Sequence, residues 1–366
     1  MNQKKTTLLL IIDSLVKGGA EVMLVGLLPE IKIKFNIILI TLSDKCEFKE
    51  NEITYDYKYS LGFKDKFSLV SCILKLKRII KKHKPGLVHA HLIYSSLIAR
   101  IACPANIPLL YSIHGELSKS DFNNSKILTY LEKTTIKKNH SLMAVSNVVL
   151  KDYEKTISKI SNSFVLHNYI FDEYLDQAIA PKIYHQTQSL KLVAVGNIKA
   201  AKNYEYLIKA FVHLKEYPVT LDIYGNTNQH LYEGLQAEIG RLSLKISFNG
   251  AIDDVREKLT NYDLFIMSSK NEGFGIAVIE AMACGLPTLL SDIPVMREIT
   301  SENALFFNLG NPEYLSNLIK EILANKHNLS KLSKKGLMIS KQYTKKEYIE
   351  NLFGIYQQLI PQVSGK

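Results

Sequence analysis

The chain has 366 residues, a length that suits two domains of ordinary size better than a single core. Its 46% hydrophobic and 22% charged residues are normal for a globular protein, and no apolar run approaches the roughly 18–20 residues that span a bilayer. The formal net charge of +11 indicates a polyanionic partner, which is either an anionic membrane face or a nucleic acid.

The four cysteines, Cys46, Cys72, Cys103 and Cys284, follow neither the spacing of a metal site nor that of a disulfide framework. We expect them to be reduced, buried thiols of a cytosolic protein. The sequence also has no Asp-x-Asp motif for a divalent ion, so we expect neither a metal nor another cofactor.

Strands and helices alternate through the first half of the chain. We expect strands over residues 7–13, 36–42, 53–57, 87–91, 109–113, 141–145 and 164–168. We expect helices over residues 22–29, 68–84 and 95–102, and a helical stretch after His114 as far as residue 139. This alternation is typical of a parallel, doubly wound sheet.

Several polar or glycine residues follow the expected strands, at the edge where such sheets collect ligands. Gly18 and Gly19 follow the first strand, where adjacent glycines let backbone amides approach a bound group closely. His91 and His114 each close a strand at the same edge. A histidine in this position can be structural or can contact a ligand, and for His91 both interpretations stay open.

The densest basic cluster lies between Lys75 and Lys84, and the apolar residues Leu69, Val70 and Ile73 precede it. A helix packed on the sheet, with a solvated basic face, explains this pattern without any partner. The alternative is peripheral contact with an anionic membrane, at roughly 1 kcal/mol per basic residue. Aromatic residues are scattered through apolar runs rather than interleaved with the basic clusters, so we expect no nucleic acid partner.

In the second half of the chain the same alternation of strands and helices follows a polar, irregular linker over residues 172–188. We therefore place one domain at residues 1–181, joined by a closing helix within residues 344–366, and the other at residues 182–343. We expect strands over residues 190–195, 219–224, 246–249, 264–267, 288–290 and 304–307. We expect helices over residues 206–214, 275–283, 294–299, 312–324, 329–341 and 345–359.

One stretch of the second half, residues 271–287, combines a strand end, a glycine-containing loop and the start of a helix. Its first helical amides point back at the carboxyl end of the strand and favour an anion. Glu272 and Glu280 bracket these amides. Ionised carboxylates accept hydroxyl hydrogen bonds well, so the combination indicates a ligand with a phosphate and vicinal hydroxyls, such as a sugar nucleotide.

The paired glutamates, with Gly273-Phe274-Gly275 between them, resemble the motif of retaining GT-B glycosyltransferases, and of glycosyltransferase family four above all. The resemblance implies two Rossmann-like doubly wound domains that face an interdomain cleft. It implies that Glu272 contacts hydroxyls of the donor sugar and that Glu280 holds the ribose. The intervening amides, of residues 273–275 and of Ile276 and Ala277, would meet the donor diphosphate.

Two further segments resemble the same family. The Gly18-Gly19-Ala20-Glu21 loop is similar to its glycine loop near the donor phosphates, and His114-Gly115 resembles its strand-His-Gly element, whose histidine contacts the donor sugar. We therefore favour a functional role for His114.

Residues 196–203 resemble a loop of this family in which an Arg and a Lys neutralise the donor diphosphate. Lys202 matches the lysine, but Asn197 stands at the arginine position and carries no charge. Lys199 of the same loop is the residue that could compensate. The resemblance also brings Gly225 and Asn226, and Phe248 to Gly250, close to the nucleoside.

The resemblance implies a retaining, metal-independent transfer from a nucleoside-diphosphate sugar to a glycan or lipid-linked acceptor in surface or capsular polysaccharide synthesis. We expect His114, Glu272 and Lys202 to act in catalysis, in a cytoplasmic protein that can sit at the inner face of the membrane. The alternative is an inactive sugar-nucleotide-binding paralogue or partner subunit, for which Asn197 is the supporting feature.

Overall fold

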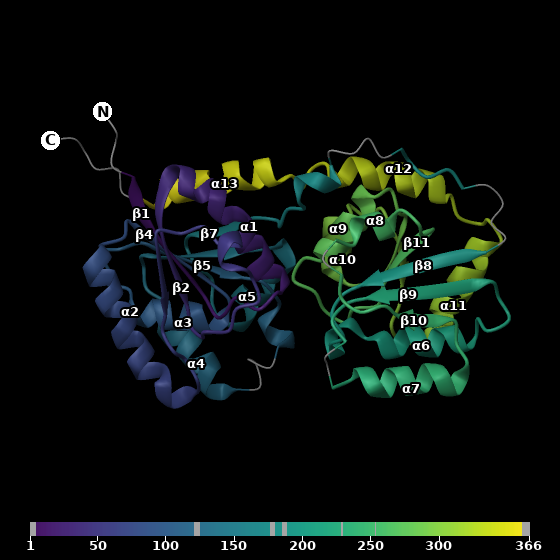
Figure 1. The fold of residues 1–366 in the computed structure, drawn as a ribbon, viewed down its shortest axis with the longest axis horizontal. Coiled ribbons are helices and arrows are strands. Elements are labelled where there is room, and N and C mark those ends of the chain that lie inside the picture. Colours follow the sequence, from purple (N-terminus) through teal and green to yellow (C-terminus); the bar gives the residue numbers. More distant parts are fainter. Residues whose placement is uncertain are drawn as a thin grey trace. The chain divides into compact units, whose positions relative to one another are not determined.

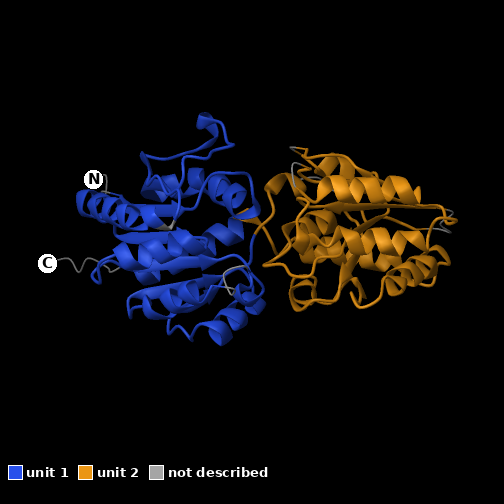
Figure 2. Cartoon of the chain, turned by 90° about the horizontal axis from the view of Figure 1, so that it is seen from below, with its two compact units in different colours: residues 1–168, 346–366 blue, residues 169–345 orange. Residues whose placement is uncertain are grey.

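The computed structural model of the chain describes residues 5–120, 125–175, 180–184, 189–227, 230–252 and 254–360. The chain divides into two compact units (Figure 2). Unit 1 contains residues 1–168 and 346–366, and unit 2 contains residues 169–345. The division therefore comes earlier in the chain than the expected boundary after residue 181.

Contacts of the segment around this boundary explain the difference. The Ile170 amide donates to the Tyr343 carbonyl at 3.0 Å, and the Lys182 amide donates to Ser333 Oγ at 2.9 Å. The predicted linker thus packs on unit 2 wherever it is described. Its residues 176–179 and 185–188 lie outside the described part of the chain.

Unit 1 is built on a seven-stranded parallel sheet of order β3-β2-β1-β4-β5-β6-β7. The strands are β1 Thr6–Ile12, β2 Phe35–Thr41, β3 Tyr57–Ser60, β4 Leu87–His91, β5 Leu109–Ile113, β6 His140–Ala144 and β7 Ser163–Val165. The helices are α1 Gly19–Lys34, α2 Leu69–His83, α3 Ile93–Ala102, α4 Lys126–Thr134, α5 Asn147–Thr156 and α13 Lys345–Leu359.

Helices cover both faces of this sheet, with α13 along one side and α2, α3 and α4 toward the other (Figure 1). Because helices bury both faces of the sheet, the sequences of its strands are nearly continuous apolar runs. The run from Leu8 to Ile12 in β1 is completely buried. The last helix belongs to this core, because the Tyr356 ring of α13 meets the Phe35 ring edge-on at 5.7 Å.

Unit 2 is built on a six-stranded parallel sheet of order β10-β9-β8-β11-β12-β13. The strands are β8 Leu190–Val195, β9 Val219–Tyr224, β10 Ile246–Phe248, β11 Leu264–Met267, β12 Thr288–Ser291 and β13 Leu305–Phe307. The helices are α6 Tyr204–Val212, α7 Tyr232–Leu242, α8 Arg256–Leu259, α9 Ile276–Ala283, α10 Pro294–Ile299, α11 Pro312–Leu323 and α12 Leu329–Ser340 (Figure 1).

Two elements predicted in the first half have different bounds. Helix α1 does not stop at Pro29 but continues to Lys34, because Pro29 lies exposed on its surface while Ile31 is buried in the core. The strand predicted at residues 53–57 begins only at Tyr57. Asp56 precedes it, and its side chain accepts a hydrogen bond from the Ile37 amide at 2.7 Å.

Helices α5, α7 and α8 were absent from the prediction, and the helix predicted as far as residue 139 is confined to α4. These helices bury few apolar residues: Val149 and Tyr153 in α5, and Ile239 in α7. Their sequence periodicity is therefore weak. The structure confirms free thiols for the four cysteines but leaves Cys46 exposed, where we expected a buried residue.

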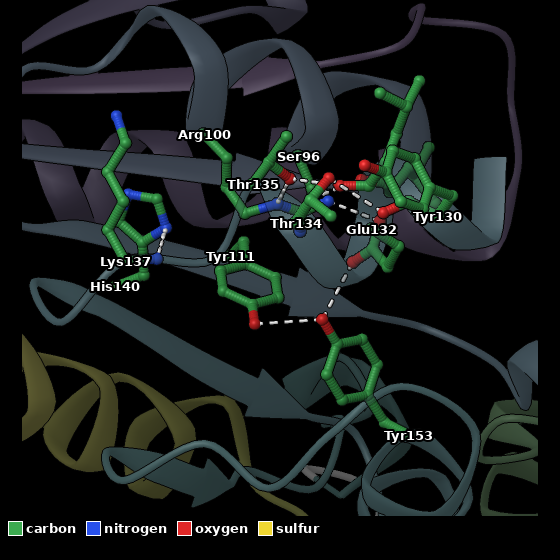
Figure 3. A network of polar contacts seen from close by, with 12 residues as sticks. Ser96, Arg100, Tyr111, Tyr130, Glu132, Thr134, Thr135, Lys137, His140 and Tyr153 are labelled. Carbon is green, nitrogen blue, oxygen red and sulfur yellow. Dashed lines mark hydrogen bonds and ion pairs between the residues drawn. The ribbon is translucent and has the colours of Figure 1, made fainter. Parts of the chain in front are cut away.

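A buried polar network links α3, α4, β5 and α5 inside unit 1 (Figure 3). The Arg100 guanidinium forms an ion pair with Glu132, and both side chains are almost wholly excluded from solvent. Tyr153 Oη donates to Glu132 Oε1 at 2.8 Å, and the Tyr111 and Tyr153 hydroxyls lie 3.1 Å apart. Removing one partner of such a pair leaves an uncompensated buried charge, so the network holds α4 to the rest of the unit.

No helix within the described ranges is both long enough and apolar enough to cross a membrane.

Candidate functional site

The carboxyl ends of the parallel strands of unit 2 lie at one edge of its sheet, and glycine-containing loops follow five of them: β8, β9, β10, β11 and β13. Three of these loops, after β8, β9 and β10, are hydrogen-bonded to one another. The Gly196 amide donates to the Tyr224 carbonyl at 2.8 Å, and the Gly225 amide donates to the Gly250 carbonyl at 2.9 Å. A Cβ on Gly225 would lie only 2.1 Å from the Gly196 carbonyl oxygen, so only glycine fits there.

The structure gives Asn197 a role that sequence reasoning missed. Its side-chain oxygen accepts a hydrogen bond from the Asn226 amide at 3.0 Å and so ties the β8 loop to the β9 loop. Its Nδ2 group makes no hydrogen bond with a residue in the described ranges and can still donate to a ligand. Lys199 is exposed and has no ion-pair partner in those ranges.

Lys202 and Glu272, both predicted as catalytic, meet directly. Lys202 Nζ lies 2.8 Å from Glu272 Oε1, and the same oxygen accepts a hydrogen bond from Ser269 Oγ at 2.7 Å. The two charged side chains are 20% and 16% exposed, so the pair is sheltered but open to a ligand. Since an ammonium group has three donors, Lys202 can hold Glu272 and an anion together.

The backbone holds this pair in place. Ser268 Oγ donates to the Lys202 carbonyl at 2.9 Å, and the Lys270 amide donates to the Ala201 carbonyl at 2.8 Å. A Cβ on Gly196 would lie 2.7 Å from Lys202 Cε, so the absence of a side chain there makes room for the lysine. The loop after β8 and the loop after β11 are thus fixed to each other.

Helix α9 begins next to this pair, at Gly275. Gly275 has a φ of +93°, and a Cβ there would lie 2.8 Å from Met296 Cε, so both conformation and space require glycine. The buried Phe274 ring packs edge-on against Tyr343 at 5.4 Å. The amides of Ile276 and Ala277 start the helix without a hydrogen-bond acceptor in the described ranges. Their partial positive charge suits a phosphate.

Glu280 follows in the second turn of α9. Burial, together with the nearby Asp254 carboxylate, raises the pKa of Glu280 to about 7. The buried Tyr174 and Cys284 belong to the same surroundings, since burial and then the Glu280 charge raise the pKa of both, that of Cys284 to about 12. The carboxyl group is therefore only partly ionised near neutral pH when the site holds no ligand, whereas we expected an ionised carboxylate.

Aromatic side chains support the edge near β10. The Phe248 ring meets Tyr204 edge-on at 6.1 Å and Tyr232 at 5.5 Å. Tyr204 Oη also donates to the Gly196 carbonyl at 2.7 Å, which joins this aromatic cluster to the β8 loop. Gly250 follows with a φ of +73°. Sequence reasoning identified Phe248 and Gly250 but missed the two tyrosines, whose positions depend on helices packed beneath the loops.

In unit 1 the glycine loop after β1 starts α1. Gly18 precedes the helix and accepts a hydrogen bond from the Val22 amide at 2.9 Å, and Gly19 is its first residue. A Cβ on Gly18 would lie 2.6 Å from Glu21 Oε2. The Asp13 carboxylate accepts hydrogen bonds from the amide and hydroxyl of Ser95, which join the end of β1 to the start of α3. Sequence reasoning did not identify Asp13.

Three histidine rings lie in a row: His89 in the middle of β4, His91 at its carboxyl end, and His114 directly after β5. The ring centroids of His89 and His91 are 4.1 Å apart, and those of His91 and His114 are 5.7 Å apart. His89 bonds to Tyr356 Oη at 2.7 Å and to Ser112 Oγ at 2.6 Å. Burial lowers the pKa of all three rings, that of His114 to about 4, so they are neutral near pH 7.

Two of these rings have unused nitrogens. His91 is 5% exposed, and neither of its ring nitrogens has a hydrogen-bond partner in the described ranges. The same holds for His114 Nε2. A neutral imidazole offers one donor and one acceptor, so these three buried ring nitrogens have hydrogen-bonding capacity that no residue in the described ranges uses. His89, which sequence reasoning missed, is instead fully occupied by Tyr356 and Ser112.

A small cavity of about 270 Å³ lies at the carboxyl ends of β2 and β3 in unit 1. Thr41, Lys58 and Ser60 are among the residues that line it. Within the described ranges no three His, Cys, Asp or Glu side chains group in a way that could hold a metal ion.

Two family models match the chain, and together they span most of its length. The model "Glycosyltransferase Family 4" matches residues 17–170, and the model "Glycosyl transferases group 1" matches residues 176–337. The first covers most of the unit 1 sheet and the second the glutamate-containing stretch of unit 2.

Individual relatives agree in length with this chain but are distant in sequence. An uncharacterized glycosyltransferase of Methanocaldococcus jannaschii is 22% identical over 93% of this chain and 95% of its own length. An alpha-monoglucosyldiacylglycerol synthase of Acholeplasma laidlawii is 25% identical over 82% of each chain. The structure of HepE from Anabaena, in complex with UDP and glucose, superposes with a TM-score of 0.80 at 18% identity, covering 96% of this chain and all of that one.

The two parallel-sheet units superpose on the structural neighbours over nearly the whole chain. One family model matches each unit. The chain therefore belongs to the group 1 glycosyltransferases and has their GT-B fold.

Proposed function

We propose that the chain is a retaining, metal-independent glycosyltransferase that uses a nucleoside-diphosphate sugar. Its acceptor is a glycan or a lipid-linked saccharide in surface polysaccharide synthesis, and it works in the cytoplasm at the inner face of the membrane.

The observation that carries the proposal is the Lys202–Glu272 pair next to the first amides of α9. The pair unites one cation for a phosphate and one carboxylate for a hydroxyl within 2.8 Å. Glu280 adds a second carboxyl group eight residues further along the chain. A phosphate alone would be repelled by two acids, whereas a sugar nucleotide has hydroxyls for both. The proposed roles are donor-sugar contact for Glu272 and ribose contact for Glu280.

Sugar transfer from a nucleoside diphosphate requires the site to stabilise the negative charge on the departing phosphate. The bond between the anomeric carbon and the phosphate oxygen breaks, and the acceptor oxygen bonds to that carbon on the same face. The acceptor proton passes to the departing phosphate oxygen, and the nucleoside diphosphate leaves. Lys202 and the amides of Ile276 and Ala277 supply positive charge where negative charge grows, and this is the usual source of the largest rate gain.

The remaining predicted residues complete the donor site in this proposal. Asn197 Nδ2 donates to the diphosphate in place of an arginine, and the amides near Gly225 and Gly250 line the nucleoside. From unit 1, Gly18 and Gly19 offer amides to the phosphates. His114, neutral near pH 7, contacts a hydroxyl of the donor sugar through its ring nitrogen.

Relatives support the choice of donor and product. The Anabaena structure contains UDP and glucose, so UDP-glucose is the first donor to test. The Acholeplasma relative is named for an alpha-linked product on diacylglycerol, which supports an alpha product and an acceptor at a membrane.

A turnover experiment tests this function directly. The purified chain is incubated with a panel of uridine- and guanosine-diphosphate sugars and a lipid extract, and NMR follows the anomeric signal of each sugar. Release of nucleoside diphosphate, with an anomeric configuration in the product equal to that of the donor, supports the proposal. An inverted product contradicts retention. Donor binding with neither transfer nor hydrolysis favours the non-catalytic alternative.

A further inference from the structure

The positive charge of the chain belongs to one unit. Unit 1 contains 27 of the 46 Lys and Arg residues and 16 of the 35 Asp and Glu residues, which gives it a formal charge of +11. Unit 2 contains 19 of each and is formally neutral. Within unit 1, residues 66–115 contain no Asp or Glu at all. Helix α2 lies in this segment.

One face of α2 combines exposed apolar and basic side chains. Val70, Leu74, Lys77 and Lys81 follow each other at helical spacing, and all four are exposed. Val70 is 64% and Leu74 50% exposed. The opposite face buries Cys72, Leu76 and Ile80 against the unit, so the helix is anchored by one side and presents the other to solvent.

The apolar part of this face extends to Phe67, which precedes the helix and is 80% exposed. Single exposed apolar residues are ordinary, but three large ones at consecutive turns of one face form a patch. A solvated basic helix would not need them. An interfacial helix does, because its apolar side chains enter the boundary between headgroups and acyl chains.

The basic part of the face has no internal partner. Lys77, Arg78, Lys81 and Lys84 form no ion pair with any residue that the structure describes. Their neighbours differ, since Lys75 donates to the Leu61 carbonyl and Lys82 to Tyr59 Oη. Three uncompensated cations on a helix without any carboxylate, and Lys84 directly after it, attract a surface of negative charge.

A groove beside the carboxyl half of α2 extends this surface. It has a volume of about 770 Å³, and its lining includes Lys77, Lys81, Lys84 and Lys137 above an apolar floor with Ile80 and Ile101. Lys84 and Ile107, which both line it, precede β4 and β5, so the groove lies at the amino ends of these strands, opposite the histidine edge.

We propose that residues 67–84 form a docking face by which the chain binds the surface of an anionic lipid bilayer. Phe67, Val70 and Leu74 enter the headgroup boundary, and Lys77, Arg78, Lys81 and Lys84 meet lipid phosphates. The groove accepts a phosphate headgroup. This inference deepens the membrane-side part of the proposed function, and vesicle binding itself requires no transferase activity.

Co-sedimentation of the full chain with vesicles tests the docking face. Vesicles of phosphatidylcholine alone are compared with vesicles that also contain phosphatidylglycerol. We expect binding to the anionic vesicles only. The K77Q/K81Q double variant is expected to bind about thirtyfold more weakly, since each basic residue near the surface contributes ~1 kcal/mol and 1.4 kcal/mol is tenfold.

Matched variants in unit 2 control for charge and hydrophobicity. K334Q/K335Q removes the same charge from the exposed face of α12, and M338S replaces an exposed apolar residue of that helix. Both are expected to bind vesicles as the parent chain does. V70S/L74S is expected to weaken binding even at low salt, which a purely electrostatic partner would not require. Circular dichroism and thermal unfolding check that every variant is folded.

Three results would overturn the docking face: equal binding to both kinds of vesicle, unchanged binding of K77Q/K81Q, or equal losses in the α12 controls. Binding to a DNA duplex but not to anionic vesicles would assign the face to nucleic acid instead. UDP-glucose affinity in the same variants is expected to be unchanged, so failure of the docking face and failure of the transferase proposal are distinguishable.

Discussion

The two units share a parallel-sheet architecture but use charge differently. In unit 2 two ion pairs, Lys202–Glu272 and Arg256–Asp254, lie near the sheet edge, and the unit as a whole is neutral. In unit 1 the sheet edge carries neutral histidines, and part of the excess positive charge lies on the outer face of α2. Paired charges in a sheltered site suit one specific ligand, whereas unpaired charges on a helix suit an extended anionic surface.

The ion pairs of the two units differ in the same way. Arg100 and Glu132 are fully buried in unit 1 and bond to Tyr153 and Thr135 within the core. Lys202 and Glu272 remain partly exposed in unit 2. The first pair is therefore expected to serve stability, and the second to serve ligand binding.

The largest effect is expected from breaking the buried pair. Glu132→Ala leaves the Arg100 charge uncompensated and should lower the free energy of unfolding by about 3–5 kcal/mol. Urea unfolding measures this change, and Glu272→Ala is the control, with an expected loss below about 1 kcal/mol. Similar losses in the two variants would remove the distinction between the pairs.

The next effect concerns Lys202. Lys202→Met removes positive charge from the departing phosphate and should lower kcat by about 10²–10³-fold with little change in stability. Lys191→Met, which removes an exposed lysine at the amino end of β8, should leave kcat unchanged. Steady-state kinetics, with the donor that gives the highest turnover, measures kcat for both variants. A kcat for Lys202→Met within twofold of the parent value, a margin of about 0.4 kcal/mol, would exclude an electrostatic role.

Glu280 links ligand binding to pH. Because the ribose contact needs the ionised carboxylate and burial raises the pKa of Glu280 to about 7, UDP-glucose affinity should fall about tenfold from about pH 8 to about pH 6. Glu280→Gln should bind more weakly at about pH 8 and lose the pH dependence. Calorimetric titration across this range measures the effect, and a pH profile shared by both proteins would assign the titration to another group.

The Glu280 carboxyl should also make the free energy of unfolding depend on pH. A carboxyl whose folded pKa lies above its unfolded value binds its proton more tightly in the folded state, so this contribution to stability is lost as pH rises from about 4.5 to about 7. The Glu280→Gln protein should lack that loss, which urea unfolding at several pH values can detect.

The smallest effect is expected at His114. His114→Ala removes one neutral hydrogen bond to the donor sugar and should lower kcat/KM by about fivefold, or ~1 kcal/mol. His89→Ala should instead destabilise unit 1, because His89 bonds to Tyr356 and Ser112. A transfer rate for His114→Ala equal to that of the parent chain would leave His114 with a structural role only.

Strands were predictable where apolar runs end abruptly at polar residues. The bounds of β4, β5, β8, β9 and β11 agree with the prediction at both ends. Helix α5 was missed because it buries only Val149 and Tyr153, although Ser146 caps it through a hydrogen bond from the Val149 amide. Weak periodicity hides such a helix, and its capping serine was the available signal.

Candidate site residues could be selected from the sequence where one short segment contains them all. Glu272, Gly275 and Glu280 lie within nine residues of the sequence, so their spacing was visible. The bond between Asn197 and Asn226, and that between His89 and Tyr356, join residues far apart in the chain and leave no local pattern. Such contacts follow from sheet order and packing, which sequence spacing does not encode.

Calorimetric titration of UDP-glucose into the parent chain, Glu280→Gln and Lys191→Met tests the donor site of unit 2 most directly. We predict saturable binding near pH 8 by the parent and Lys191→Met proteins, and binding by Glu280→Gln that is weaker by about 2 kcal/mol. Equal affinity in all three proteins would contradict the proposed donor site.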